Sequence, residues 1–158
     1  MAKGKTKARV SGIVPNLFLD VKRKRSKELR LQTLIDGKTL AAQIVLKGAF
    51  DDRVVWDLPG GAPPDYTPSI AGKKTIEDYE QVLPKFVKGH HKNKWTESNS
   101  SVQERIARER AWSDMLDELH PDEAAVLIAM VDGTLNKLYN SVCLDLAKEA
   151  FPELFPND

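Results

Sequence analysis

A helix is predicted for residues 121–133, which read PDEAAVLIAMVDG. Its opening proline suits a first turn, and the two acids that follow complement the positive end of the helix dipole. The closing Asp-Gly pair ends it. The apolar run inside, residues 124–131, is far shorter than the ~20 residues needed to cross a bilayer, so no membrane segment is expected.

Apolar residues at helical spacing predict further helices on both sides of this stretch. A capping box beginning at Ser101 opens the preceding one, and Pro152 ends the last. Residues 51–58 are rich in strand-forming side chains and are expected to be extended. The other expected helices span about residues 15–35, 38–50, 75–86 with a kink at Pro84, 102–120 and 135–151. The predicted fold is mainly α, a compact bundle of five or six helices.

A Gly/Pro-rich loop divides this bundle near its middle. Residues 59–64 read PGGAPP, which neither a helix nor a central strand accommodates. We therefore place a sub-domain boundary in the loop 58–74. With 158 residues, of which 41% are hydrophobic, the chain fits one domain over residues 15–158, preceded by a basic flexible arm at residues 1–14.

The single cysteine and the N-terminus indicate the compartment. Cys143 cannot form an internal disulfide, which favours a reducing environment. It lies within an apolar pattern where a thiol is usually buried and inert. The N-terminus lacks the apolar stretch of a signal peptide. We expect a soluble, intracellular protein.

Charge is distributed very unevenly along the chain, although the net charge is only +1. Residues 1–30 carry ten basic and two acidic side chains, whereas residues 97–158 carry five basic and thirteen acidic ones. Such asymmetry indicates a basic segment that meets a polyanion or folds back on the acidic half.

The basic segment is the candidate nucleic-acid interface, because lysines and arginines gain free energy when phosphates release their counterions. The alternatives are a solvated basic helix, or one paired with the acidic C-terminal half. No motif for reading bases is visible. The candidate nucleic-acid-binding residues are Lys3, Lys5, Lys7, Arg9, Lys22, Arg23, Lys24, Arg25, Lys27 and Arg30.

A second basic patch combines cations with one indole ring. This ring either stacks on a base or anchors a loop to the core, and we favour the anchoring role. Its members are Lys85, Lys88, His90, His91, Lys92, Lys94 and Trp95.

Catalytic, metal and cofactor motifs are not found. His90 and His91 are adjacent and point in different directions on regular structure, and His120 lacks ligand-spaced neighbours. Residues 67–75 depart from a phosphate-binding loop, and several of the paired carboxylates lie at expected helix starts, where capping explains them. We expect neither enzymatic activity nor a metal or other cofactor.

Four motifs carry a family resemblance: LKGAFDDR at 46–53, LPGGAPP at 58–64, MLDELHPDEAA at 115–125 and KEAFP at 148–152. In order and spacing they resemble an uncharacterised family of small myovirus proteins, notably from phages of cyanobacteria and their relatives, over residues 30–155. The resemblance implies a phage protein in the host cytoplasm, and it carries over no catalytic residue. The basic arm lies outside it.

These observations favour a non-enzymatic accessory protein that binds DNA or RNA, or a nucleoprotein complex, through its basic N-terminal segment. The alternative is a protein–protein interaction module, as a virion component or a modulator of a host protein. Its contact surface would be the acidic C-terminal half or the Gly/Pro-rich loop.

Overall fold

The computed structural model describes residues 12–64, 66–68, 70, 73–87 and 102–155. Within these ranges the chain forms seven α-helices, three short 3-10 helices and no β-strand, so the prediction of a mainly α fold is confirmed. The α-helices are α1 (Ile13–Arg23), α2 (Lys27–Asp36), α3 (Leu40–Phe50), α4 (Val102–Asp117), α5 (Pro121–Asp132), α6 (Leu135–Leu138) and α7 (Leu144–Ala150). The 3-10 helices are η2 (Ile76–Tyr79), η3 (Leu83–Phe86) and η5 (Pro152–Leu154).

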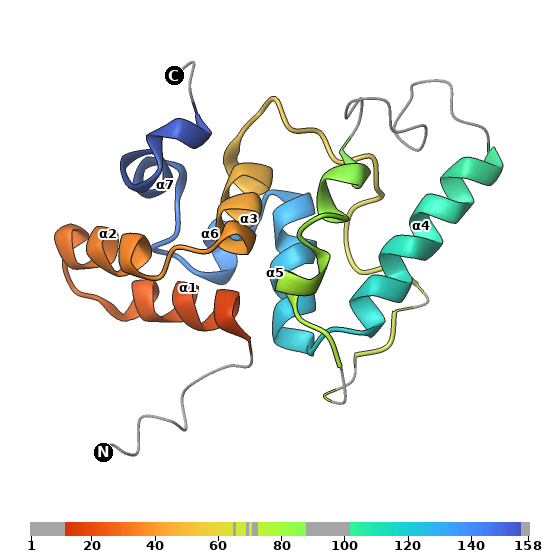
Figure 1. Ribbon diagram of the computed structural model, residues 1–158, viewed down its shortest axis with the longest axis horizontal. Coiled ribbons are helices and arrows are strands. Elements are labelled where there is room, and N and C mark those ends of the chain that lie inside the picture. Colours follow the sequence, from red (N-terminus) through yellow and green to blue (C-terminus); the bar gives the residue numbers. More distant parts are fainter. Residues whose placement is uncertain (1–11, 65, 69, 71–72, 88–101, 156–158) are drawn as a thin grey trace.

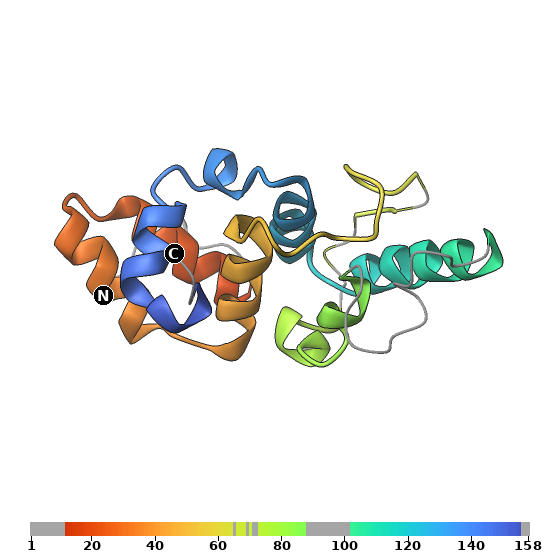
Figure 2. The same cartoon turned by 90° about the horizontal axis from the view of Figure 1, so that it is seen from above.

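The helices are arranged along an elongated body (Figures 1 and 2). Helices α1, α2 and α7 form one end, α3 and α5 pack against each other in the middle, and α4 stands at the other end. One hydrophobic core runs through the body and includes residues from both ends, such as Phe18 of α1 and Trp112 of α4.

Helix α5 is the most central element, and both of its predicted ends are confirmed. Pro121 occupies the first turn, and Gly133 after the last residue adopts the left-handed conformation with φ of 73°. A glycine adopts this conformation without the steric cost that a side chain brings. Between the two ends, α5 buries five apolar side chains that meet α1, α3, α4 and α6: Ala124, Val126, Leu127, Ala129 and Met130.

Helices α3 and α5 approach each other closely at Gly48, which is buried. A Cβ atom at this position would overlap the Trp56 ring and lie 3.0 Å from Met130 Sδ. The Trp56 indole N–H donates to the Gly48 carbonyl oxygen at 2.9 Å, so the ring that fills the space is also held in place.

We predict that Gly48→Ala destabilises the protein by about 1–3 kcal/mol, since an added methyl group overpacks this crossing. Urea unfolding followed by circular dichroism measures the change. Leu40→Ala on the same helix, whose side chain is 52% exposed, is the control and should shift stability by less than about 0.5 kcal/mol. Equal stability of Gly48→Ala and the wild type would contradict the prediction.

Two predicted long helices are each divided in the structure, so those two predictions were wrong. The first breaks between α1 and α2, where Lys24 takes an extended conformation and the Ser26 side chain caps α2. The last breaks between α6 and α7, where the Asn136 side chain donates to the carbonyl oxygens of Asn140 and Val142. In both places a polar side chain binds backbone groups that a continuous helix would have paired.

Three further local predictions also differ from the structure. Residues 75–86 form the two 3-10 helices η2 and η3 in place of one kinked helix. In residues 51–58 only Trp56 makes a β-bridge, to Val87. Cys143 is half-buried at the N-cap of α7 and not inside a helix. Pro84 lies in the first turn of η3, and a proline has no backbone N–H with which to continue one helix through residues 75–86.

The Gly/Pro-rich loop is held from two directions. Gly61 N–H donates to Asp132 Oδ1 at the end of α5, at 2.8 Å. Arg108 of α4, only 2% exposed, donates from Nε to the Asp57 carbonyl oxygen at 2.7 Å. The loop therefore packs against α4 and α5. Among the described residues, no helix has both the length and the hydropathy to cross a membrane.

Candidate nucleic-acid interface

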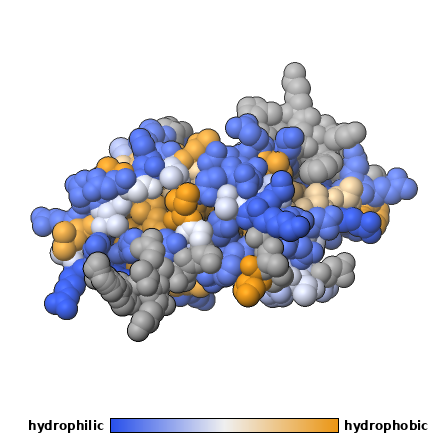
Figure 3. Space-filling model, turned by 60° about the horizontal axis from the view of Figure 1, so that its bottom comes forward, coloured by the Kyte–Doolittle hydropathy of each residue, from blue (hydrophilic) through white to orange (hydrophobic). Residues whose placement is uncertain are grey.

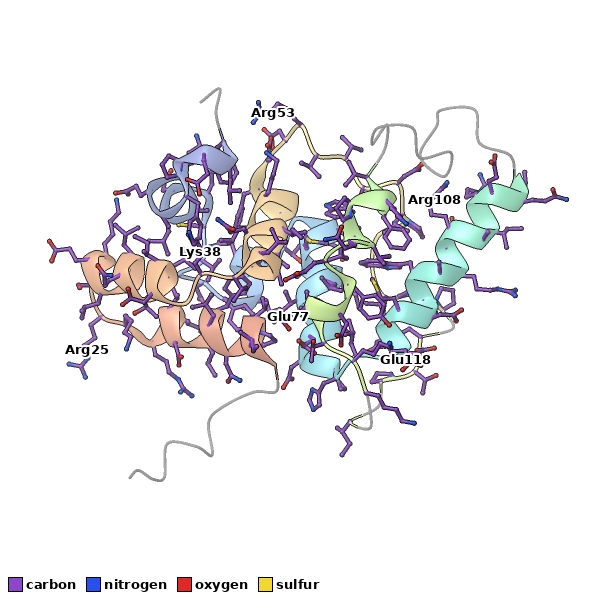
Figure 4. The ribbon with its side chains drawn as sticks, viewed as in Figure 1. Arg25, Lys38, Arg53, Glu77, Arg108 and Glu118 are labelled. Carbon is purple, nitrogen blue, oxygen red and sulfur yellow. The ribbon has the colours of Figure 1, made fainter. Side chains whose placement is uncertain are left out.

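Six of the predicted binding residues cluster where α1 meets α2. Lys22 and Arg23 end α1, Lys24 and Arg25 form the connection, and Lys27 begins α2, with Arg30 one turn further on. We call these six residues the basic turn. All except Arg30, which is half-buried, are exposed, and Figure 4 shows Arg25 projecting away from the helices. The other four predicted residues, Lys3, Lys5, Lys7 and Arg9, lie outside the described residues.

The turn has a defined backbone shape. Lys24 N–H donates to the Val21 carbonyl oxygen at 3.1 Å, and Val21 is fully buried, which anchors the end of α1. Arg30 Nε donates to the Lys24 carbonyl oxygen at 3.0 Å and closes the turn from the other side. Ser26 Oγ accepts the Leu29 N–H at 3.1 Å and starts α2. The exposed cations are thus presented from a hydrogen-bonded turn.

Helix dipoles account for only part of the charge in the basic turn. Lys22 and Arg23 lie in the last turn of α1, where cations complement the negative helix end. Arg25 and Lys27 flank the N-cap of α2, whose end is positive, so they oppose its dipole. These two cations therefore gain nothing from the dipole of α2.

The acidic C-terminal region neutralises one of these cations directly. Lys27 Nζ forms an ion pair with Glu149 of α7. The hydrogen bond and the charge of Glu149 raise the pKa of Lys27, with a smaller contribution from Asp145. Lys22, Lys24 and Arg25 form no ion pair with any residue in the part of the chain that the structure describes. The folding-back alternative therefore applies at Lys27.

The second basic patch lies almost wholly outside the described ranges. Lys85 is exposed on η3, whereas Lys88, His90, His91, Lys92, Lys94 and Trp95 fall among residues that the structure does not describe. His120 has a structural role: its Nδ1 accepts the Asp122 N–H at 3.1 Å and caps α5. Within the described ranges, no three His, Cys, Asp or Glu side chains are placed to hold a metal ion.

A buried polar cluster around Asp51 was not predicted from the sequence. Its carboxylate accepts from Arg53 Nε at 2.9 Å and from Lys47 Nζ at 2.9 Å. The hydrogen bond from Arg53 is the main reason that the pKa of Asp51 lies well below its usual range. Lys47 Nζ also donates to the Leu154 carbonyl oxygen at 2.6 Å, which ties α3 to η5. This cluster joins distant segments and has a structural role.

A groove between α4 and the Gly/Pro-rich loop was also missed. Its volume is about 520 Å³, and proline rings lie on one side with Ile106 and Trp112 of α4 on the other. Glu109, Arg110 and Asp114 add charge to its rim. The proline run was the available sequence signal, because it cannot join a helix and has to lie across other elements.

A family of unknown function, DUF6433, matches the chain over residues 17–137. The chain belongs to this family. The part matched by DUF6433 takes in the whole basic turn, the Gly/Pro-rich loop and α2–α5, and it leaves out Lys3–Arg9 and α7. A search of curated proteins found no match, and a search of solved structures found none.

We predict that Ser26→Ala lowers the free energy of unfolding by about 1 kcal/mol, because it removes the cap of α2. Thermal and urea unfolding measure the effect. Ser26→Asn, which retains a side-chain acceptor, is the matched variant and should stay close to the wild type. If both variants lost the same stability, the cap would not be what stabilises the basic turn.

Proposed function

We propose that the protein is a non-enzymatic phage accessory protein that binds nucleic acid, or a nucleoprotein complex, in the host cytoplasm. The observation that carries the binding proposal is the exposed run Lys22–Arg25 in a hydrogen-bonded turn between two helices. The phage assignment is supported by the sequence resemblance alone.

Electrostatics favour a phosphate backbone as the ligand of the basic turn. Four consecutive cations in a tight turn point in several directions, and an extended polyanion can contact several of them at once. Arg25 and Lys27 stand beside the positive end of α2, whose dipole also favours an anion. Contacts of this kind position phosphates and carry no base information, so we propose binding without sequence preference.

If the basic turn binds nucleic acid, the affinity should fall steeply as the salt concentration rises. Replacing Lys22, Arg23, Lys24 and Arg25 by serine should make the slope of log K against log salt less steep by about 3.6 for duplex DNA, at about 0.9 for each phosphate contact. Fluorescence-anisotropy titration of labelled duplex and single-stranded DNA and RNA at several salt concentrations measures this slope.

Four exposed lysines elsewhere on the body provide the matched control for total charge. Their replacement by serine should leave the slope nearly unchanged, and a deletion of residues 1–11 measures the contribution of the arm. Loss of affinity as large in the control as in the turn variant, or no binding at low salt, would overturn the proposal. The control lysines are Lys38, Lys73, Lys74 and Lys137.

Removing the acidic partner of Lys27 should strengthen binding. Glu149→Gln frees one cation and deletes a carboxylate that repels phosphate, so affinity should rise on the order of threefold at low salt and less at high salt. The same titration measures the change. Asp114→Asn on α4, at the opposite end of the body, deletes an equal charge and should have a smaller effect. If the two variants raised the affinity equally, binding would depend on net charge alone and not on the position of Glu149.

A protein–protein interaction module is the second candidate function, and the groove beside α4 favours it. Val102 and Ile106 on the first turns of α4 are 60% and 52% exposed, and Ile106 faces the proline rings across the groove. Exposed apolar side chains next to such a cavity suit an apolar partner surface. Ile106→Glu should abolish capture of such a partner and leave the salt-dependent binding of nucleic acid unchanged.

A further inference from the structure

Three segments that are distant in the sequence meet at the side chain of Glu123. This residue lies in the first turn of α5 and is only 1% exposed. Ile76 N–H at the start of η2 donates to Glu123 Oε2 at 3.2 Å. Gly12, just before α1, packs so tightly that a Cβ atom there would overlap the carboxyl group at 2.6 Å from Cδ. The carboxyl group therefore joins the beginnings of α1, η2 and α5.

A second carboxyl group is buried close by. Both carboxylate oxygens of Glu77, on η2, are shielded from solvent and have no hydrogen-bond partner among the described residues. Figure 4 shows Glu77 in the region between α1 and α5. Burying a carboxylate without a hydrogen-bond partner is costly.

The charged groups that act on Glu123 are all acidic. Glu77 and Asp78 face it from η2, and Asp122 is its neighbour on α5. Asp122 Oδ2 lies 3.5 Å from His120 Nδ1, and this nitrogen accepts the Asp122 N–H. On the α1 side, Asp20 lines the hollow that Gly12 and Thr75 share. Figure 3 shows separate apolar patches among hydrophilic residues on the face of the body that its view brings forward.

Burial raises the pKa of Glu123 to about 7, against the opposing effect of the hydrogen bond from Ile76, and the neighbouring carboxylates raise it further. Near neutral pH Glu123 therefore retains a proton that an exposed glutamate would release.

We propose that the Glu123 carboxyl group, with Glu77 beside it, forms a protonation-dependent clamp on the N-terminus of α1. With the proton on Glu123, the beginnings of α1, η2 and α5 stay packed together. When that proton is lost, the buried Glu123 carboxylate is repelled by its acidic neighbours and Gly12 is released from it. The first turn of α1 then loosens.

The sign of the pH dependence follows from linkage. Between the unfolded pKa of 4.5 and the folded value of about 7, the folded protein binds more protons than the unfolded chain. Stability therefore falls as pH rises through this window, and the contribution of the clamp is complete only below it. A lysine partner or a metal ion on the pair would give the opposite trend.

The closing experiment is NMR on the full chain between pH 4 and 9. Carbon-detected spectra follow the side-chain carboxyl carbons of Glu123 and Glu77, and hydrogen exchange gives protection factors for the Asn16 and Ile76 amides. Asn16 N–H donates to the Gly12 carbonyl oxygen at 3.2 Å, so its amide reports on the start of α1. We expect the Glu123 carboxyl carbon to titrate near pH 7 and both protection factors to fall at least tenfold between pH 6 and 8.5.

Two variants and one control separate the clamp from general effects of pH. In Glu123→Gln both protection factors should be independent of pH, and in Glu77→Gln the midpoint of Glu123 should move toward acid pH. Asp114→Asn, exposed on α4, should titrate as the wild type does. The proposal is overturned if the Glu123 carboxyl carbon titrates between pH 4 and 5. It is equally overturned if Glu77→Gln, which keeps the hydrogen bond from Ile76, leaves the titration of Glu123 unchanged.

Discussion

The packing of α5 against α3 is the constraint on which the rest of the structure depends. At Gly48 the absence of a side chain lets the two helices approach, and the Trp56 ring and Met130 fill the space beside the crossing. Because Trp56 precedes the Gly/Pro-rich loop, this contact also sets where the loop leaves the core. From α5 the body then extends in two directions, toward α1, α2 and α7 at one end and toward α4 at the other.

The basic turn and the groove lie at opposite ends of this axis. The end formed by α1, α2 and α7 exposes the basic turn, whose backbone is held by Ser26 and Arg30 and in which Lys27 is paired with Glu149. The opposite end offers a groove between α4 and the proline run, and Arg108 fastens the two walls together. Between the two ends, the carboxyl groups of Glu123 and Glu77 lie at the N-terminus of the very helix that ends in the basic turn.

Much of the helical structure could be predicted from local pattern. The ends of α5 followed from Pro121 and Gly133, and the range of α3 from its apolar stripe after Thr39, because caps and periodicity act within a few residues. The divisions between α1 and α2 and between α6 and α7 were missed. There, apolar spacing continues across the break, while side chains such as Asn136 bind backbone groups that the pattern assigns to a helix.

By itself the sequence determined the mainly α fold, the Gly/Pro-rich loop and the concentration of cations near the N-terminus, since these depend on residue type and short-range spacing. Only the tertiary structure decided that Lys27 is paired, because its partner Glu149 lies more than a hundred residues away in the sequence. It likewise decided that Glu123, one acid among several at helix starts, is buried against Gly12 and Ile76. Burial and charge pairing depend on which distant segments approach each other, and no local pattern contains that information.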